Sequence, residues 1–239
     1  MEKNVWVYWT GQKPQLIDML LNLMEQHSKK GRGYRLHILN DNNLRDFITV
    51  PSYFDKLQGS HKSDYVRVKV IKKHGGIWLE GNTLVMSDLS KLFGYFEKKE
   101  GFFILENGKR IITGVFGSKK ETKLMIEWDK QIDEILKKKE EKIEWTEIGT
   151  SILKDIRKNH PDWISNYQII NGLDDMYRVD WKQASRVYYS ESKEWYKQMK
   201  GDELQVLVGE IYKEWDRREI ISEKTVLYRL IAKSTRNIN

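Results

Sequence analysis

The order of hydrophobic and polar positions along the chain predicts an α/β protein. Val5 to Trp9 is a β-branched and aromatic run, which is typical of a buried strand. From Gln15 to about His27, apolar side chains recur at helical spacing, and Leu36 and Ile38 then alternate with polar neighbours. The polar cluster Asn40 to Asn43 closes this second strand. A strand, a helix and a strand of these lengths form a βαβ unit, whose parallel strands end at one edge of a sheet.

Later segments continue this alternation. Further helices are predicted at Leu44 to Ile48, Lys120 to about Lys142, Ile148 to Ile156, and from Asp202 onward, where Leu204, Leu207, Val208 and Ile211 form one stripe. Further strands are predicted at Thr83 to Met86, Phe102 to Leu105, Ile111 to Phe116, Tyr167 to Ile170 and Val187 to Tyr189. An Asn-Gly pair after Glu106 indicates a hairpin. We expect a mostly parallel central sheet flanked by helices, in one domain over residues 1–239, with a helical extension from about residue 200.

The stretch from Ser63 to Met86 concentrates the candidate chemistry. A basic amphipathic helix ends at a Gly-Gly pair, and a short apolar strand then leads to a turn that holds Glu80 and Asn82. Asp64 and Arg67 stand three positions apart, so they share one face of the helix. Polar side chains that follow such a strand lie where open α/β sheets bind ligands, at the carboxyl edge.

This stretch resembles the donor-binding core of the DXD-type sugar transferases, the glycosyltransferase family 32 and capsular-polysaccharide-synthesis group. Their pattern is roughly S-D-x-x-R, a helix, then G-G-[IV]-[YW]-[LI]-D-x-D, and the matching residues are Ser63, Asp64, Arg67, Gly75, Gly76, Ile77, Trp78 and Leu79. The sequence departs from the pattern at the acidic pair, which is Glu80-Gly81-Asn82. The resemblance implies a GT-A-like fold, a nucleotide-sugar donor that is UDP-linked, a glycan or glycoconjugate acceptor, and transfer that retains anomeric configuration.

The resemblance also implies roles for the helix residues. Asp64 and Arg67 are expected to act as the catalytic pair that binds the donor sugar, with Arg67 also facing the phosphates. A carboxylate accepts hydroxyl hydrogens and a guanidinium donates in a fixed fork, so the pairing suits a sugar. The structural alternative is an exposed ion pair that contributes about 0.3 kcal/mol.

Donor contacts are also expected from the ends of the first two strands. By resemblance, Tyr8, Trp9 and Thr10 lie near the nucleoside and Asp41 approaches its base or ribose, while Gly76 belongs to the donor-binding Gly-Gly segment. The alternative for the aromatic residues of the first strand is packing in the core, and for Trp9 the two interpretations remain open. The segment around Thr113 and Gly114 corresponds to the acceptor side, with an ordinary strand interior as its alternative.

A divalent ion, Mn²⁺ or Mg²⁺, is expected at Glu80 and Asn82, because oxygen ligands suit such ions. Glu80 supplies a carboxylate, but Asn82 supplies only a neutral oxygen, which should weaken the site. Three outcomes stay open: weaker metal binding completed by the diphosphate, substitution of the metal by basic side chains, or a silent site. A last metal or phosphate contact from a C-terminal loop is expected in this group, and Ser190 to Trp195 is a candidate without a motif.

Composition adds limits. The net charge of +7 suits nucleic acid, an anionic membrane surface or phosphate-bearing substrates, but Lys and Glu are mixed and no nucleic-acid signature accompanies them. The chain has no cysteine, so disulfides and cysteine-based zinc sites are excluded. MEKNVWVYW lacks the apolar core of a signal peptide, and no apolar run approaches the length of a membrane span. We therefore expect a cytoplasmic protein without a transmembrane segment, for which peripheral membrane contact through a basic face stays open.

These observations predict a glycosyltransferase. The alternative is a non-catalytic protein of the same fold that binds a nucleotide-sugar or a glycan, and a basic nucleic-acid-binding protein is the weakest of the three. No histidine pair, P-loop or dinucleotide-binding fingerprint supports another enzyme class.

Overall fold

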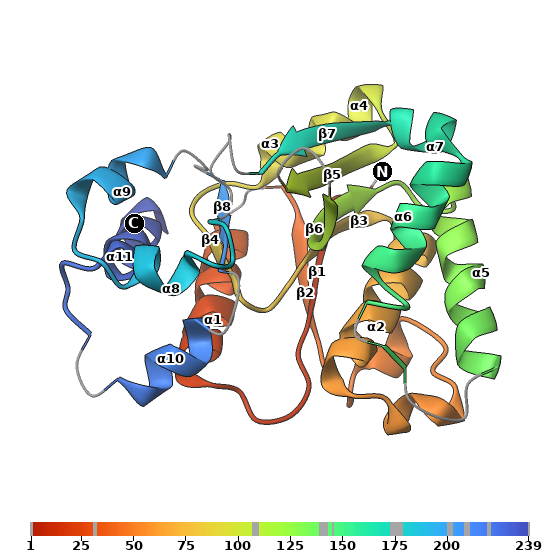
Figure 1. Cartoon of the computed structure of the whole chain (residues 1–239), viewed down its shortest axis with the longest axis horizontal. Coiled ribbons are helices and arrows are strands. Elements are labelled where there is room, and N and C mark those ends of the chain that lie inside the picture. Colours follow the sequence, from red (N-terminus) through yellow and green to blue (C-terminus); the bar gives the residue numbers. More distant parts are fainter. Residues whose placement is uncertain are drawn as a thin grey trace.

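A six-stranded mixed sheet forms the centre of the molecule (Figure 1). The computed structural model describes residues 2–30, 33–106, 110–138, 143–144, 146–172, 179–199, 203–207, 211–218 and 221–238. The strands of this sheet, in spatial order, are β2 (Arg35–Leu39), β1 (Asn4–Tyr8), β3 (Gly76–Leu79), β6 (Arg110–Ser118), β5 (Gly101–Glu106) and β7 (Tyr167–Asn171). Only β6 runs against the others within this described sheet, because its pairs with β3 and β5 are antiparallel. The predicted mostly parallel sheet is confirmed, and the Asn-Gly turn of the β5–β6 hairpin lies outside the described residues.

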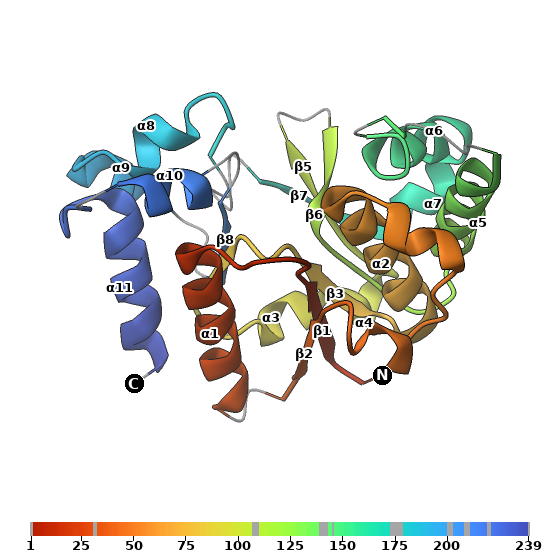
Figure 2. The same cartoon turned by 90° about the horizontal axis from the view of Figure 1, so that it is seen from below.

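Helices cover both faces of the sheet (Figures 1 and 2). One face carries α1 (Gln15–Lys29), α3 (Ser90–Phe93), α4 (Tyr95–Lys98), α8 (Ala184–Tyr188), α9 (Lys193–Gln198), α10 (Ile211–Arg217) and α11 (Val226–Ile238). The other carries η1 (Leu44–Asp46), η2 (Ser52–Lys56), α2 (Gly59–His74), α5 (Lys123–Lys138), α6 (Thr150–Asn159) and α7 (Pro161–Ser165). Side chains of β1 point alternately to the two faces of the sheet. Val5 and Val7 pack in the layer that contains α1, whereas Trp6 and Tyr8 pack in the layer that contains α2. Trp6, for which the core is the favoured interpretation of the sequence, is buried there.

A small two-stranded sheet corrects the expected all-helical tail. β8 (Leu204–Val206) pairs antiparallel with β4 (Thr83–Val85), so the stripe expected to begin a helix at Leu204 begins a strand instead. A short apolar run fits either structure, and here the hydrogen bonds to β4 decide. The sequence predicts Val187 to Tyr189 as a strand, but Val187 and Tyr188 belong to helix α8. Val187 is buried in the helical layer, where no strand of the described sheets lies beside it to pair with. Helices α10 and α11 confirm the helical character of the remaining tail.

The Gly-Gly turn fixes how α2 leads into β3. Gly75 and Gly76 have φ angles of 69° and 112°, a region that favours glycine. A Cβ atom on Gly76 would lie 2.3 Å from the carbonyl oxygen of Asn4, so β3 packs against β1 only with glycine there. The Trp6 indole closes the turn by donating to the Gly75 carbonyl oxygen at 2.9 Å. The turn thus sets the direction of β3, whose last residue is Leu79, and Glu80 follows at the carboxyl edge of the sheet.

Ion pairs attach α2 to α5 on its outer side. The Nζ atoms of Lys69 and Lys72 lie 2.5 and 2.8 Å from the two carboxylate oxygens of Asp129, which is buried. Helix α2 is therefore held between the sheet and α5, and the residues it directs toward the carboxyl edge have a rigid base.

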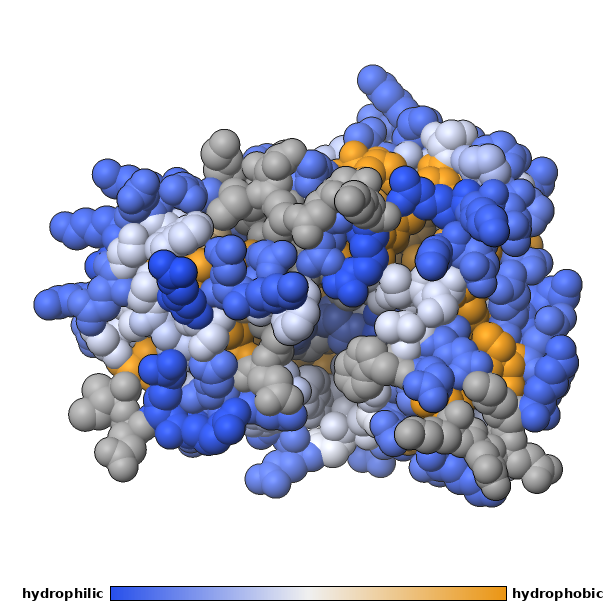
Figure 3. Space-filling view, viewed as in Figure 1, coloured by the Kyte–Doolittle hydropathy of each residue, from blue (hydrophilic) through white to orange (hydrophobic). Residues whose placement is uncertain are grey.

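The outer surface is mostly polar. The face drawn in Figure 3 is largely hydrophilic, with small hydrophobic patches between charged side chains. Across the described residues, no helix combines the length and the apolar character that crossing a bilayer requires.

Candidate active site

A cleft of about 820 Å³ lies at the carboxyl edge of β1 and β3. Among the residues that line it are Tyr8, Trp9, Thr10, Asp64, Arg67, Glu80 and Asn82. The acceptor-side candidates Thr113 and Gly114 line it too, so nine of the candidate residues singled out in the sequence surround one cavity. Two others do not line it: Asp41 lies behind Tyr8 and Thr10, and Gly76 lies at the opposite end of β3 from Glu80.

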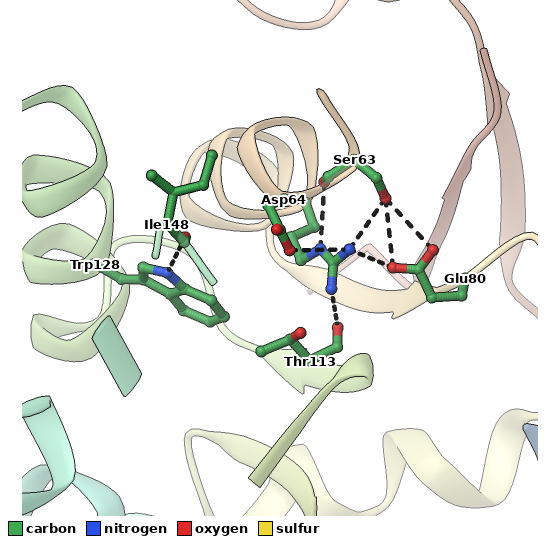
Figure 4. Close-up of polar contacts among 7 residues, drawn as sticks. Ser63, Asp64, Glu80, Thr113, Trp128 and Ile148 are labelled. Atoms are coloured by element: carbon green, nitrogen blue, oxygen red, sulfur yellow. Dashed lines mark hydrogen bonds and ion pairs between the residues drawn. The ribbon is translucent and has the colours of Figure 1, made fainter. Parts of the chain in front are cut away.

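The Arg67 guanidinium contacts four of the residues labelled in Figure 4, namely Ser63, Asp64, Glu80 and Thr113. Its Nη2 atom lies 3.1 Å from the Ser63 hydroxyl and 3.2 Å from Asp64 Oδ1, and it forms a close ion pair with Glu80. Its Nη1 atom donates to the carbonyl oxygen of Thr113 at 2.8 Å. Only 6% of the Arg67 side chain is exposed, so the alternative of an exposed surface pair with Asp64 does not apply. One guanidinium thus holds carboxylates from α2 and from the end of β3 in a fixed arrangement.

Asp64 is a buried carboxyl group in this arrangement. Burial raises its pKa from 3.8 to about 6; Arg67 opposes the shift and the charge of Glu80 adds to it. The backbone before α6 approaches it closely, since a Cβ atom on Gly149 would lie 2.9 Å from Asp64 Oδ1. The Trp128 indole fixes that approach by donating to the Ile148 carbonyl oxygen at 3.2 Å (Figure 4). Asp64 therefore has a defined position on the cleft wall.

A specific contact holds each residue of the Glu80-Gly81-Asn82 turn in place. Glu80 continues β3 by donating its amide hydrogen to the Gly114 carbonyl oxygen at 2.8 Å. Gly81 lies close against the Trp9 indole: a Cβ atom on residue 81 would be only 2.8 Å from the ring, so a larger residue does not fit there. The side-chain amide of Asn82 donates to the backbone carbonyl oxygen of Leu207 at 2.6 Å. The backbone N–H of Leu207 in turn donates to the backbone carbonyl oxygen of Asn82 at 3.1 Å. A carboxylate cannot make the first of these bonds, which accounts for an amide where the pattern has an acid.

Asp41 binds protein groups beside the end of β1. Its carboxylate accepts hydrogen bonds from the Tyr8 hydroxyl, from the Thr10 hydroxyl at 2.7 Å and from Lys62 Nζ at 3.2 Å. Burial alone would raise the pKa of Asp41, but these three donors outweigh it and hold that pKa below its ordinary value. Asp41 thus orients Tyr8 and Thr10, and those two side chains reach the cleft.

Comparison with known families decides the relationship of the chain. The family described as capsular polysaccharide synthesis protein matches residues 1–230. The chain belongs to this family. The resemblance carried by the Ser63 to Leu79 pattern is therefore confirmed, and it extends over nearly the whole sequence. A comparison with curated proteins finds no match.

Solved structures of glycosyltransferases share the fold of this family member at low sequence identity. The apo form of GlyE from Streptococcus pneumoniae TIGR4 has 14% identity and a TM-score of 0.51 over 98% of this chain, which spans 64% of that chain. A glycosyltransferase involved in glycosylation of the major capsid of PBCV-1 has 11% identity and a TM-score of 0.56, covering 91% of this chain and 98% of that one. The galactosyltransferase LgtC, solved with donor and acceptor sugar analogs, has 10% identity and a TM-score of 0.51, covering 92% and 98%. The chain therefore has the GT-A fold that these glycosyltransferases share.

The oxygens available for a divalent ion in this family member are few. The described residues contain no group of three or more His, Asp or Glu side chains that could hold a metal. The candidate ligands are the Glu80 carboxylate, which also pairs with Arg67, and the side-chain oxygen of Asn82, whose amide nitrogen is bonded to Leu207. Mg²⁺ binds through one or two carboxylates when substrate phosphates and water complete its shell. By themselves these residues fit a divalent ion only weakly, and phosphate and water oxygens would have to complete its shell.

Several cleft residues carry no sequence signal. Trp181 is 57% exposed and lines the cleft, and so do Tyr212 and Lys213 of α10. Among the described C-terminal residues, Val206 of β8 and two residues of α10 line the cleft. The candidate segment Ser190 to Trp195 does not line it; there Ser192 caps α9 by accepting from the Trp195 backbone amide. Tyr212 packs at right angles to Trp9, with ring centroids 6.0 Å apart. Only folding brings α10 to β1, so the sequence could not show this contact.

Proposed function

We propose that the protein transfers a sugar from a nucleotide-sugar, UDP-linked, to a glycan or glycoconjugate, with retention of anomeric configuration. The observation that carries the proposal is the convergence of Asp64, Arg67, Glu80 and Asn82 on one cleft at the carboxyl edge of the sheet. The family and the fold support the same reaction class.

In this proposal Asp64 accepts hydrogen bonds from the donor sugar. Its carboxylate is buried and oriented, so little entropy is lost when a hydroxyl binds it. Arg67 pairs with both Asp64 and Glu80 and lines the cleft with them. We assign to Arg67 the positioning of the two carboxylates and stabilisation of the negative charge that develops on the leaving group.

The nucleoside is assigned to the end of β1. Tyr8 and Thr10 are oriented by Asp41, and Trp9 is partly exposed beside Gly81, so a planar base can stack near this turn. Glu80 and Asn82 would hold Mn²⁺ or Mg²⁺. When bound, the ion would neutralise charge on the diphosphate.

A titration with UDP tests the donor class. We expect calorimetric binding of UDP that is strengthened by Mn²⁺, and a donor-hydrolysis rate that Glu80→Gln lowers about tenfold or more. Glu97→Gln on the exposed face of α4 is the matched control and should leave both values unchanged. Absence of UDP binding with and without Mn²⁺ would contradict the assignment of the donor.

The second candidate function is binding without turnover. It is favoured by the Arg67–Glu80 ion pair and by the Asn82–Leu207 bond, which leave a weak set of metal ligands. The same assay separates the two candidates: a protein that binds UDP but neither hydrolyses nor transfers sugar from any donor is a binder.

A further inference from the structure

Trp181 is an exposed aromatic side chain that lines the cleft. It lies in the turn before α8, and 57% of the residue is exposed. In the described part of the chain, the other exposed large hydrophobic residue is Ile126 of α5, which does not line the cleft. Single apolar side chains on an outer surface are ordinary, but an open aromatic ring in a cleft is a typical ligand contact. The proposed function gives no role to this ring.

The backbone holds Trp181 in place although its ring is open. Asp180 Oδ1 accepts a hydrogen bond from the backbone N–H of Lys182 at 2.9 Å, which closes a tight turn around Trp181. Val179 and Ala184, on either side of this turn, are buried. The Lys182 Nζ atom lies 5.8 Å from the ring centroid, so it covers at most one of the two faces of the ring. A tryptophan side chain has only two rotatable bonds, so an anchored turn presents its ring to a ligand at small entropic cost.

A second aromatic position in the cleft is separate from Trp181. Trp9 and Tyr212 contact each other, with ring centroids 6.0 Å apart and ring planes at 89°. Within the described residues, no ring contact joins Trp181 to either of them. Trp9, which lies against Gly81, is the ring assigned to the nucleoside base. The cleft thus has one aromatic position for a base and another for a different part of the substrate.

The chemistry of the cleft suits a sugar ring at this second position. A pyranose has a face of C–H groups and a rim of hydroxyl groups, so a site for it combines an aromatic surface with polar partners. Asp64, Thr113 and Thr150 line the same cleft as Trp181 and carry oxygens that can bond to hydroxyl groups.

We infer that Trp181 is a stacking surface for a pyranose ring of the substrate. The inference rests on the proposed function, because it names how that site holds a sugar. The stacked ring belongs to the donor sugar or to the acceptor. These two sources share the same chemistry, and separate binding measurements distinguish them.

Calorimetry with UDP, UDP-glucose and UDP-galactose tests whether the stacked ring is the donor sugar. In that case Trp181→Ala should weaken binding of the UDP-sugars about tenfold and leave the affinity for UDP within about twofold, because UDP lacks the pyranose. Trp181→Phe keeps a flat ring and should bind within about threefold of wild type. Ile126→Ala removes exposed apolar surface outside the cleft and is the matched control, with no change expected for any ligand.

NMR titration of the UDP-saturated protein with methyl β-D-glucopyranoside and methyl β-D-galactopyranoside tests whether the ring is that of the acceptor. These glycosides carry neither phosphate nor base, so their binding reports on contacts to the sugar alone. In that case at least one of them should bind, Trp181→Ala should weaken this binding about tenfold, and Trp181→Phe should largely restore it. Ile126→Ala is again the matched control. Trp181→Ala should keep the wild-type melting temperature, because the ring it removes is exposed.

The outcomes separate this inference from the proposed function. The inference is overturned if Trp181→Ala weakens neither UDP-sugars nor glycosides, if no sugar ligand binds, or if UDP itself is weakened as much as the UDP-sugars, since the ring then stacks on the base. Donor hydrolysis that depends on Glu80 would leave the proposed function standing in each of these cases. If UDP fails to bind while a glycoside still binds the free protein through Trp181, the proposed donor is wrong and the sugar subsite stands.

Discussion

Replacing Asn82 with aspartate restores the acidic pair of the sequence pattern and tests the structural reason for its absence. The Asn82 amide nitrogen donates to the Leu207 carbonyl oxygen at 2.6 Å. Aspartate loses this bond and also places a charged oxygen against a carbonyl oxygen. Loss of such a bond at a partly buried position costs about 1–2 kcal/mol. For a chain of this size, the melting temperature should fall by about 2–8 °C.

Metal and pH should each reverse part of this loss. The added carboxylate strengthens the site at Glu80, so Mn²⁺ should raise the melting temperature of Asn82→Asp more than that of wild type. The folded state favours the neutral acid, which can donate to Leu207, so the pKa of the new carboxyl is raised above its unfolded value. Stability is then regained as the pH falls through that raised pKa. The melting temperatures of variant and wild type should therefore converge toward pH 4.

Thermal melts of wild type, Asn82→Asp and Asn82→Ala, with and without Mn²⁺, measure these effects. Asn82→Ala loses the bond without adding charge and should lack the response to Mn²⁺. Asn22→Asp on the exposed face of α1 adds the same charge and should leave the melting temperature unchanged. A metal-free Asn82→Asp protein as stable as wild type would refute the role of this amide.

Three further predictions follow from the cleft. Because burial raises the pKa of Asp64 to about 6, its stabilising contribution is complete below about pH 4 and lost as the pH rises through 6. Urea denaturation should show wild type losing stability relative to Asp64→Asn across that interval. Gly149→Ala places a methyl group 2.9 Å from Asp64 Oδ1 and should cost about 1–3 kcal/mol in urea denaturation while weakening donor hydrolysis. Trp181→Ala removes an exposed ring that lines the cleft, so stability should change by less than about 0.5 kcal/mol in urea denaturation while the rate of sugar transfer falls.

The local structure of the central stretch could be predicted because its chemistry is local. A Gly-Gly pair after a helix, an apolar run and a polar turn determine where Glu80 emerges, and helical spacing places Asp64 beside Arg67. The two faces of β1 could be assigned in the same way, because side chains alternate along a strand: Trp6 and Tyr8 face one layer, and Val5 and Val7 face the other. Such short-range rules locate the candidate residues but not their partners.

Long-range pairing explains what the sequence could not show. Leu204 to Val206 has no feature that distinguishes a strand from a helix until β4 offers it hydrogen bonds. The same segment delivers Leu207 to Asn82, 125 positions away, and that contact gives the amide its reason. In the sequence alone, the change from acid to amide indicates a weaker metal site, a metal replaced by basic side chains, or a silent site. In the folded chain the same amide joins the turn after β3 to Leu207, the residue that follows β8, so the departure from the pattern has a structural role.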